Sequence, residues 1–350
     1  MSLSFGQETL AGSPAWRPPS FGAALPRITE FTGTTCRGIA ARLNMREPYR
    51  TQFAELLKEG AAVQDIHDSP DASGYAVIHR SSDQFVQREL ARVDHHRRNA
   101  CWLLEEYVGR VEKILDVGCG TGGFSVALAS SPELRPMEVV GIDVSRLAVE
   151  AAQVRARGYD LPSTLVSFMG CSPGKRLPFK DNCFDLTVCS SVIEFVTSKR
   201  ARAELIMELG RVTRPRGYVF TATPNPLRLY EYHSRKFLGD YFHRSGFPWA
   251  SCPWEFSRMF SGWQEIPVTK YHRKKLVERL GAPLPIPEKV VKAISWIAPW
   301  QNRSFHKRRA SKIAPLQRSI RAGVRASAGG RIAPGPRTGS EAYGDASQCG

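Results

Sequence analysis

The chain has 350 residues, enough for one α/β domain with extensions, and its hydrophobic (42%) and charged (23%) fractions are typical of globular proteins. No apolar run approaches the roughly 18–20 residues of a membrane-spanning helix, and the N-terminus lacks the pattern of a secretory signal, so we expect a cytoplasmic protein. The eight cysteines form no Cys-x-x-Cys pair, which argues against a zinc site, and we predict no metal.

The net charge of +16 is unevenly distributed. Residues 303–350 contain ten Lys or Arg and two Asp or Glu, so this last part carries +8, half of the excess. Such a basic tail attracts anionic surfaces, either nucleic acid or lipid headgroups. A solvated tail without any partner is the alternative.

The N-terminal part is predicted to contain two kinds of segment. Residues 1–36 are rich in Pro, Gly, Ser and Thr without periodicity, which predicts disorder. Residues 37–110 are expected to be a helical extension, because apolar residues recur at helical spacing in 38–66 and 82–108.

From residue 111 the pattern predicts a βα alternation, with strands at 111–117, 138–144, 164–168, 184–190 and 218–223 and helices at 123–130, 146–157 and 201–212. Strands separated by helix-length connections pair in parallel with right-handed crossovers. We therefore predict an α/β fold, a Rossmann-like doubly wound and mostly parallel sheet, for the domain at 111–281.

Two C-terminal segments differ from this core. Residues 230–263 hold eleven of the 34 aromatic residues, which predicts an apolar lid over a substrate pocket. Residues 282–350 are predicted to be an amphipathic segment followed by a basic, largely disordered tail. The apolar side of the amphipathic segment predicts peripheral membrane contact through 289–312, and a core-facing role is the alternative.

The most informative motif is ILDVGCGTGG at residues 114–123, where a strand runs into a glycine-rich turn and a helix. Gly118, Gly120 and Gly122 permit a tight turn and close approach of a ligand to the backbone. The same letters match the Gly-x-Gly-x-x-Gly pattern of dinucleotide sites. Asp116 argues against a pyrophosphate, because a carboxylate would repel it, and favours a cationic ligand.

A second acidic residue, Asp143, ends the next predicted strand 27 residues further on. A carboxylate in that position can accept both hydroxyls of a ribose. Two acids and three glycines at this spacing point to a ligand that has a positive charge and a sugar.

The chain resembles the class I S-adenosylmethionine (SAM)-dependent methyltransferases, especially the branch of the ubiquinone and menaquinone biosynthesis enzymes. The glycine motif is supported by LPFKDNCFDL at 177–186, by VIEFV at 192–196 and by RPRGY at 214–218. The resemblance covers about residues 95–225 and extends more weakly to 281.

This resemblance implies a SAM cofactor, with Asp116, Gly118 and Gly120 beside its methionine part and Asp143 on its ribose. Gly122 and Val144 complete the predicted cofactor-binding set. Cys171 and Ser172 occupy the place where the family often has an acidic residue facing adenine, so they are assigned to the adenine. Phe195 replaces the family's usual His, which removes one candidate base.

A hydroxyl acceptor would need a general base near the transferred methyl group. Histidine has a suitable pKa, and His233 and His243 lie in the aromatic segment, so we predict them together with Glu194 as catalytic candidates. His95 and His96 are further candidates. Asp185, at the start of a predicted strand, is expected to be structural.

Residues 189–192 read CSSV and lack the Asn/Asp-Pro-Pro-Tyr/Phe motif of nitrogen-methylating nucleic-acid enzymes, so nucleic acid is disfavoured as a substrate. The leading hypothesis is methyl transfer to a small, hydrophobic or lipid-linked acceptor, with O-methylation slightly favoured. An RNA methyltransferase that uses the basic tail, a non-catalytic SAM-binding scaffold and a nicotinamide-linked oxidoreductase are the alternatives. The sequence does not define the oligomeric state.

Overall fold

The structure is a computed structural model. It describes residues 44–62, 83–107, 111–131, 134, 137–172, 176–196, 198–224, 230–231, 236–237, 258–280, 286–297 and 300–307. His233, His243 and most of the predicted lid at 230–263 lie outside the described residues.

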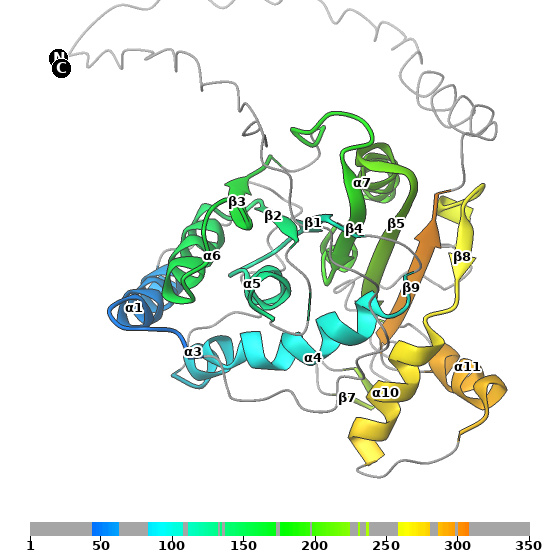
Figure 1. Cartoon of the computed structure of the whole chain (residues 1–350), viewed down its shortest axis with the longest axis horizontal. Helices are drawn as coiled ribbons and strands as arrows, with labels where there is room; N and C mark the ends of the chain where they lie inside the picture. Colours follow the sequence, from blue (N-terminus) through cyan, green and yellow to red (C-terminus); the bar gives the residue numbers. More distant parts are fainter. Residues whose placement is uncertain are drawn as a thin grey trace, which may run out of the picture. The chain divides into compact units, whose positions relative to one another are not determined.

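The core is a seven-stranded sheet in the order β3-β2-β1-β4-β5-β9-β8. Its parallel strands are β1 (Lys113–Val117), β2 (Glu138–Asp143), β3 (Val166–Gly170), β4 (Phe184–Ser190) and β5 (Thr213–Pro224). The strands β9 (Trp300–His306) and β8 (Gln264–Ile266) continue the sheet, β9 running antiparallel to both of its neighbours. The predicted mostly parallel, doubly wound sheet is confirmed (Figure 1).

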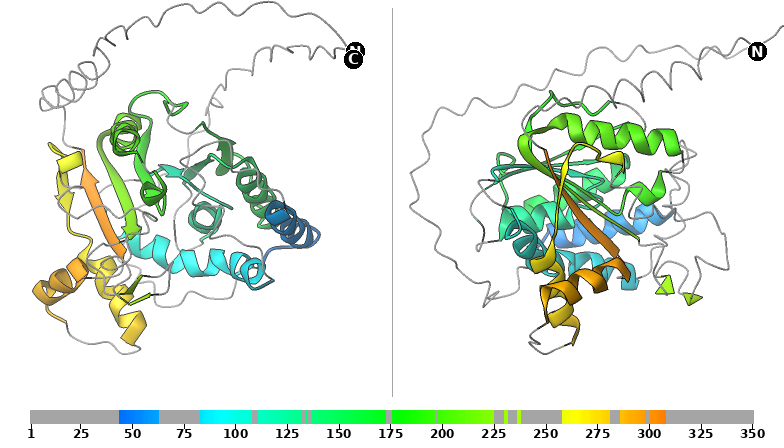
Figure 2. Two further views of the ribbon diagram at one scale, coloured as in Figure 1. Left: turned by 180° about the vertical axis from the view of Figure 1, so that it is seen from behind. Right: turned by 90° about the vertical axis from the view of Figure 1, so that its right-hand side faces the viewer.

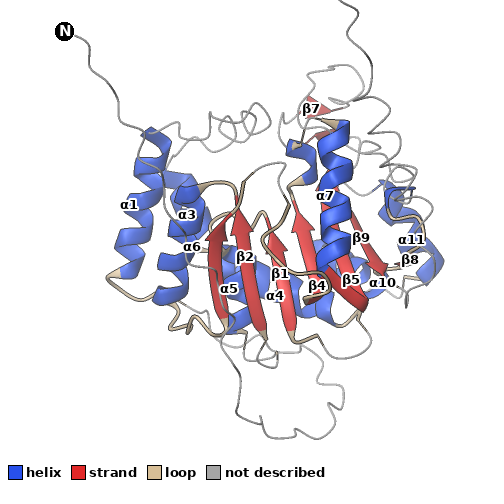
Figure 3. Cartoon of the chain, turned by 90° about the horizontal axis from the view of Figure 1, so that it is seen from above, coloured by secondary structure: helices blue, strands red, loops and turns tan. Residues whose placement is uncertain are grey.

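Neighbouring residues of β1 and β2 enter different cores, because successive side chains of a strand point to opposite faces. Ile114 and Val139 belong to the core that includes residues of α4 (Arg92–Leu104), α5 (Gly123–Ser130), α6 (Arg146–Gly158) and α10 (Thr269–Leu280). Leu115 and Val140 belong to the core that includes residues of α7 (Lys199–Val212). Figure 3 shows α7 in front of the sheet and α5 behind it.

The order of the sheet changes direction between β1 and β4. The chain winds outward from β1 through β2 to β3, and then returns to place β4 on the other side of β1. In open α/β sheets, ligands bind beyond the carboxyl ends of the strands at such a switch point. This edge is therefore where a functional site is expected.

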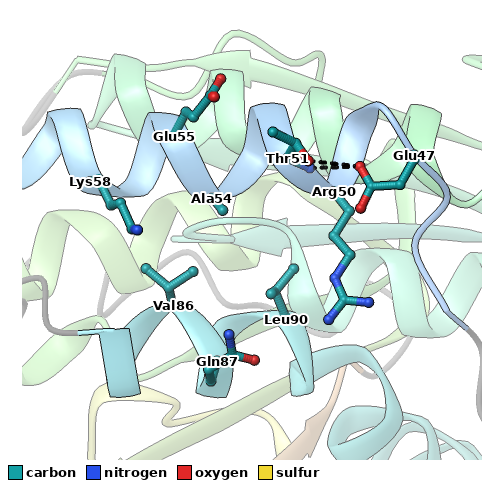
Figure 4. A pocket seen from close by; sticks show the side chains of 9 residues that line it. All are labelled: Glu47, Arg50, Thr51, Ala54, Glu55, Lys58, Val86, Gln87 and Leu90. Carbon is teal, nitrogen blue, oxygen red and sulfur yellow. Dashed lines mark hydrogen bonds between the residues drawn. The ribbon is translucent and has the colours of Figure 1, made fainter.

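The N-terminal helices pack against α6 at one end of the sheet. Phe53 and Leu57 of α1 (Tyr49–Ala62) and Val86 of α3 (Asp83–Leu90) form a buried cluster with Ala151 and Val154 of α6. Figure 2 shows α1 in blue at the opposite end from the yellow and orange C-terminal helices. A groove of about 520 Å³ lies between α1 and α3 and contains none of the predicted site residues (Figure 4).

The C-terminal part contains a strand that the sequence analysis did not predict. After α11 (Glu288–Ile297), β9 pairs with β5 along seven residues, and Phe305 is buried and stacks on Phe260 with 4.0 Å between ring centroids. This strand reads WQNRSFH, so it lacks the apolar alternation that identifies a strand. Its pairing with β5 places residues 300–306 in the sheet. These residues are part of the segment 289–312 that was predicted to contact a membrane.

Three further short strands, β6 (Tyr230–Glu231), β7 (Lys236–Phe237) and β8, were not predicted, and the start of β5 differs from the prediction. The strand β5 begins at Thr213, five residues before the predicted start, because RPRG forms an irregular start with Arg216 at φ 67°. The strands β6 and β7 form a short hairpin that follows β5. No helix among the described residues has the length and hydropathy to span a membrane.

Candidate functional site

The glycine bend at residues 118–122 connects β1 to α5 and is anchored to the end of β2. The backbone amides of Gly118 and Cys119 donate to the carbonyl of Ile142 over 2.8 and 3.0 Å. Gly118 has φ 71°, and a Cβ there would stand 2.1 Å from a methyl group of Val192, so only glycine fits. The bend thus packs closely between the ends of β2 and β4.

Gly122 has a second conformational requirement. It precedes the first residue of α5 with φ 76°, and a Cβ there would come within 2.8 Å of both Ala152 and the ring of Phe168. Gly120 lies between these glycines at φ 53°. The sequence interpretation of the motif as a tight turn between strand and helix therefore agrees with the geometry.

Asp143, at the end of β2, forms a hydrogen bond with the glycine bend. Its Oδ2 accepts a hydrogen bond from the Gly120 amide over 2.8 Å, and its Oδ1 accepts one from the Ser145 amide over 2.9 Å. Burial raises the pKa of Asp143, and these amide hydrogen bonds oppose the rise. An ionised carboxylate offers about four acceptor positions, so two hydroxyls can still bind.

Asp116 lies deeper, at 3% exposure on β1. Its Oδ2 accepts a hydrogen bond from the Ser125 hydroxyl on α5 over 2.6 Å. Burial raises the pKa of Asp116 to about 6, the Ser125 bond lowers it, and the charge of Asp143 raises it further. The sequence analysis did not identify Ser125, although its place in the first turn after the glycines was visible.

Within the described part of the chain, neither Asp116 nor Asp143 forms an ion pair. Burying carboxylates without a cation is unfavourable, and the raised pKa values express that cost. A cationic ligand would offset it, whereas a pyrophosphate would increase it. The site therefore suits a ligand that has a positive charge.

Three further predicted residues lie next to the end of β2. The Cys171 amide donates to the Asp143 carbonyl over 2.9 Å, which places residues 171 and 172 beside that aspartate. Burial and the charge of Asp143 raise the pKa of the Cys171 thiol to about 11, so it is neutral at pH 7. Val144 is 46% exposed and Ser172 is exposed, and an exposed apolar side chain here suits the face of a flat ring.

Glu194 lies between the ends of β4 and β5. It belongs to the short helix η1 (Ile193–Phe195), is fully buried, and accepts a hydrogen bond from the Thr223 hydroxyl over 3.2 Å. The carboxylate is therefore enclosed by the protein and not solvated. The contact with Thr223 could not be predicted from a local pattern, because the two residues are 29 positions apart.

The two described histidine candidates lie on α4, away from η1. His95 is exposed. His96 packs edge-on against Phe124 with 5.7 Å between ring centroids, and burial, together with the charge of Arg92, lowers its pKa well below the usual value. His96 is therefore neutral at pH 7.

Asp185 occupies the opposite end of the sheet. Its Oδ2 accepts hydrogen bonds from the backbone amides of Glu112 and Lys113 over 2.6 and 3.0 Å, and its Oδ1 pairs with Arg214 over 2.7 Å. These contacts join the starts of β1, β4 and β5. They give Asp185 the structural role expected of it.

The fold and the site together define a class I SAM-dependent methyltransferase domain, and the cofactor of this class is SAM. Residues 115–221 match the family model described as a methyltransferase domain. This match confirms the resemblance and favours SAM over a nicotinamide dinucleotide as the ligand.

Two curated relatives and one solved structure illustrate the similarity. The chain is 29% identical to the ubiquinone biosynthesis O-methyltransferase of Leptothrix cholodnii over 39% of this chain and 54% of that protein. It is 28% identical to the chloroplastic tocopherol O-methyltransferase of Arabidopsis thaliana over 53% and 52%, respectively. A SAM-dependent methyltransferase structure from Methanosarcina mazei is 28% identical with a TM-score of 0.31, over 35% of this chain and 57% of that one. The chain spans about half the length of these two curated relatives.

Proposed function

We propose that this protein transfers a methyl group from SAM to a small, hydrophobic or lipid-linked acceptor, with an oxygen atom slightly favoured as the methylated position. The observation that carries the proposal is the pair Asp116 and Asp143, two carboxylates around a glycine bend without an ion-pair partner among the described residues. The methyltransferase domain match at residues 115–221 supports it.

Each site residue has a distinct task in this proposal. When bound, SAM supplies an electrophilic methyl group for in-line displacement, so the protein mainly positions donor and acceptor. Asp116 attracts the positively charged methionine end. Asp143 accepts the ribose hydroxyls while it holds the bend through the Gly120 amide. Val144 packs against the adenine, and Cys171 and Ser172 lie beside it.

Glu194 is the described candidate for the general base. It lies fully buried beside the ends of β4 and β5, next to the switch point where the acceptor would meet the donor. Removal of a proton from an acceptor hydroxyl by Glu194 would make the oxygen a better nucleophile. His233 and His243 remain predicted alternatives.

The nature of the acceptor is supported by two observations. Two relatives are named for O-methylation, one in ubiquinone biosynthesis and the other of tocopherol. Ubiquinone and tocopherol are both apolar molecules. The aromatic residues of 230–263 supply an apolar lid in this proposal. Residues 300–306 of the predicted membrane-contacting segment at 289–312 form β9, so the proposed peripheral membrane contact is assigned to α11. Together with a cytoplasmic location, that contact would give access to such an acceptor.

The proposal is tested by incubating the purified full chain with methyl-labelled SAM and fractionated cell extract. We expect the label in the lipid or apolar metabolite fraction. Label in RNA would mean that the acceptor is RNA and not an apolar small molecule. Binding of SAM without transfer to any fraction would favour the non-catalytic scaffold. The variant Glu194→Gln should retain SAM affinity and lose transfer if Glu194 is the base.

A further inference from the structure

The glycine bend contains a threonine whose hydroxyl is held by two buried charged residues from other helices. Thr121 Oγ1 donates to Glu89 Oε2 over 2.6 Å and accepts from Arg155 Nη2 over 2.9 Å. Glu89 lies on α3 and is 3% exposed, and Arg155 lies on α6 and is fully buried. Thr121 therefore connects the cofactor bend to two helices outside it.

Arg155 extends this connection to the N-terminal helices. Its Nη1 donates to the Glu89 carbonyl over 2.9 Å, and its Nη2 lies 3.3 Å from Glu89 Oε2. The guanidinium also lies 4.4 Å from the ring centroid of Phe53 on α1, and Arg92 pairs with the same glutamate. One guanidinium thus meets α1, α3 and the bend, and a shift of α3 would be transmitted to Thr121.

The charges in this network also matter for a cationic ligand. Burial lowers the pKa of Arg155 to about 10, against the opposing effect of Glu89, so the guanidinium stays charged at pH 7. Its positive charge lies directly behind a bend that is proposed to take a cation. Glu89, which pairs with both Arg155 and Arg92, offsets part of that positive charge, and without it the repulsion between Arg155 and the ligand would increase.

We infer that Glu89 and Arg155 are positioning residues for the donor site, which act through the Thr121 hydroxyl and make α1 and α3 part of the SAM-binding unit. The inference rests on the proposed function, because it concerns affinity for SAM. Coupling between sites is reciprocal, so docking of α3 should tighten SAM binding and SAM should in turn stabilise α3.

The test compares SAM dissociation constants of full-length variants by calorimetry. Thr121→Val removes the hydroxyl at nearly constant volume and should weaken SAM binding at least about fivefold. Thr121→Ser keeps the hydroxyl and should stay within about twofold of wild type. Glu89→Gln should weaken binding at least about as much as Thr121→Val, because it also exposes the ligand to the Arg155 charge.

A matched control exists on α1. Thr51 Oγ1 also donates to a glutamate, Glu47 Oε2, over 2.8 Å, but this exposed pair lies at the α1 groove and not at the bend (Figure 4). Thr51→Val should leave SAM affinity unchanged. Hydrogen exchange supplies a second measurement, in which SAM should protect the α3 amides of wild type and not those of Thr121→Val.

The outcomes are distinguishable from failure of the proposed function. If wild type does not bind SAM, the proposed function fails. If wild type binds and the two Thr121 variants bind equally, whether like wild type or equally weakly, the inference is wrong. Wild-type SAM affinity of a folded Glu89→Gln variant would also overturn the inference. If that variant does not fold, the inference is tested by the two Thr121 variants and by hydrogen exchange of the α3 amides.

Discussion

Asp185 at the start of β4 and Asp143 at the end of β2 are both aspartates at strand ends, but they have different partners. Asp185 pairs with Arg214 and accepts from two backbone amides. Asp143 also accepts from two amides but has no ion pair among the described residues, and neither has Asp116 nearby. The amino end of the sheet therefore neutralises its buried acid internally, whereas the carboxyl end leaves negative charge for a ligand.

The comparison is tested most strongly by removing Asp143, the acid that is proposed to bind the ribose of SAM. Asp143→Ala should weaken SAM binding by about 100-fold, because charge-assisted bonds to two ribose hydroxyls are lost. Calorimetry on the purified variant measures this. Asp143→Asn serves as the isosteric partner, and affinity equal to wild type in both would remove Asp143 from the cofactor site.

Removal of Asp185, the acid that pairs with Arg214, should lower the stability of the protein and leave its SAM affinity nearly unchanged. Asp185→Ala leaves Arg214 and the amides of Glu112 and Lys113 without their acceptor, so the free energy of unfolding should fall by about 2 kcal/mol. Urea denaturation measures the loss. SAM affinity of the folded variant should stay within about twofold of wild type, and a large change in affinity would erase the distinction between the two ends.

The bend that carries the ligand site should be intolerant of a side chain where it packs most tightly. Gly118→Ala forces a positive φ on alanine and a clash with Val192, and should cost about 1.5 kcal/mol of stability. Gly170→Ala is the control at the end of β3, since no atom lies within 4 Å of a Cβ there. Equal stability of the two variants, measured by thermal unfolding, would contradict the packing described.

The raised pKa of Asp116 predicts a pH dependence. A cation binds the ionised form, so SAM affinity should fall about fivefold between pH 6 and pH 5 if Asp116 titrates near 6. The stability of the protein without ligand has the opposite pH dependence. The folded state binds the Asp116 proton more tightly than the unfolded state does, so the contribution of Asp116 to stability falls as the pH rises from about 4 to about 6. Calorimetry at several pH values checks this, and Asp116→Asn should flatten both profiles.

Much of the fold could be predicted from the sequence because the parallel strands are apolar and the glycine motif marks the first turn. The ranges of α5 and β4 agree with the prediction to the residue. The strand β9 could not be predicted, since its polar sequence becomes a strand only through pairing with β5. Its position also shows that residues 300–306 belong to the sheet and not to a free tail.

The candidate site shows the same limit. Motif spacing identified Asp116, Asp143 and the glycines, because these residues are close in sequence to the strand ends that position them. Contacts made across the fold, such as Thr223 with Glu194 and Glu89 with Thr121, leave no local pattern. The sequence therefore predicted the turn at the glycines, and it did not predict the contacts that support that turn.

The central claim is that the negative carboxyl edge of the sheet binds a cationic sulfonium compound. Titration calorimetry of the intact protein with SAM and, separately, with a nicotinamide dinucleotide tests it most directly. We expect saturable binding of SAM that weakens on acidification, and no binding of the dinucleotide. Tight binding of the dinucleotide without any response to SAM would contradict it.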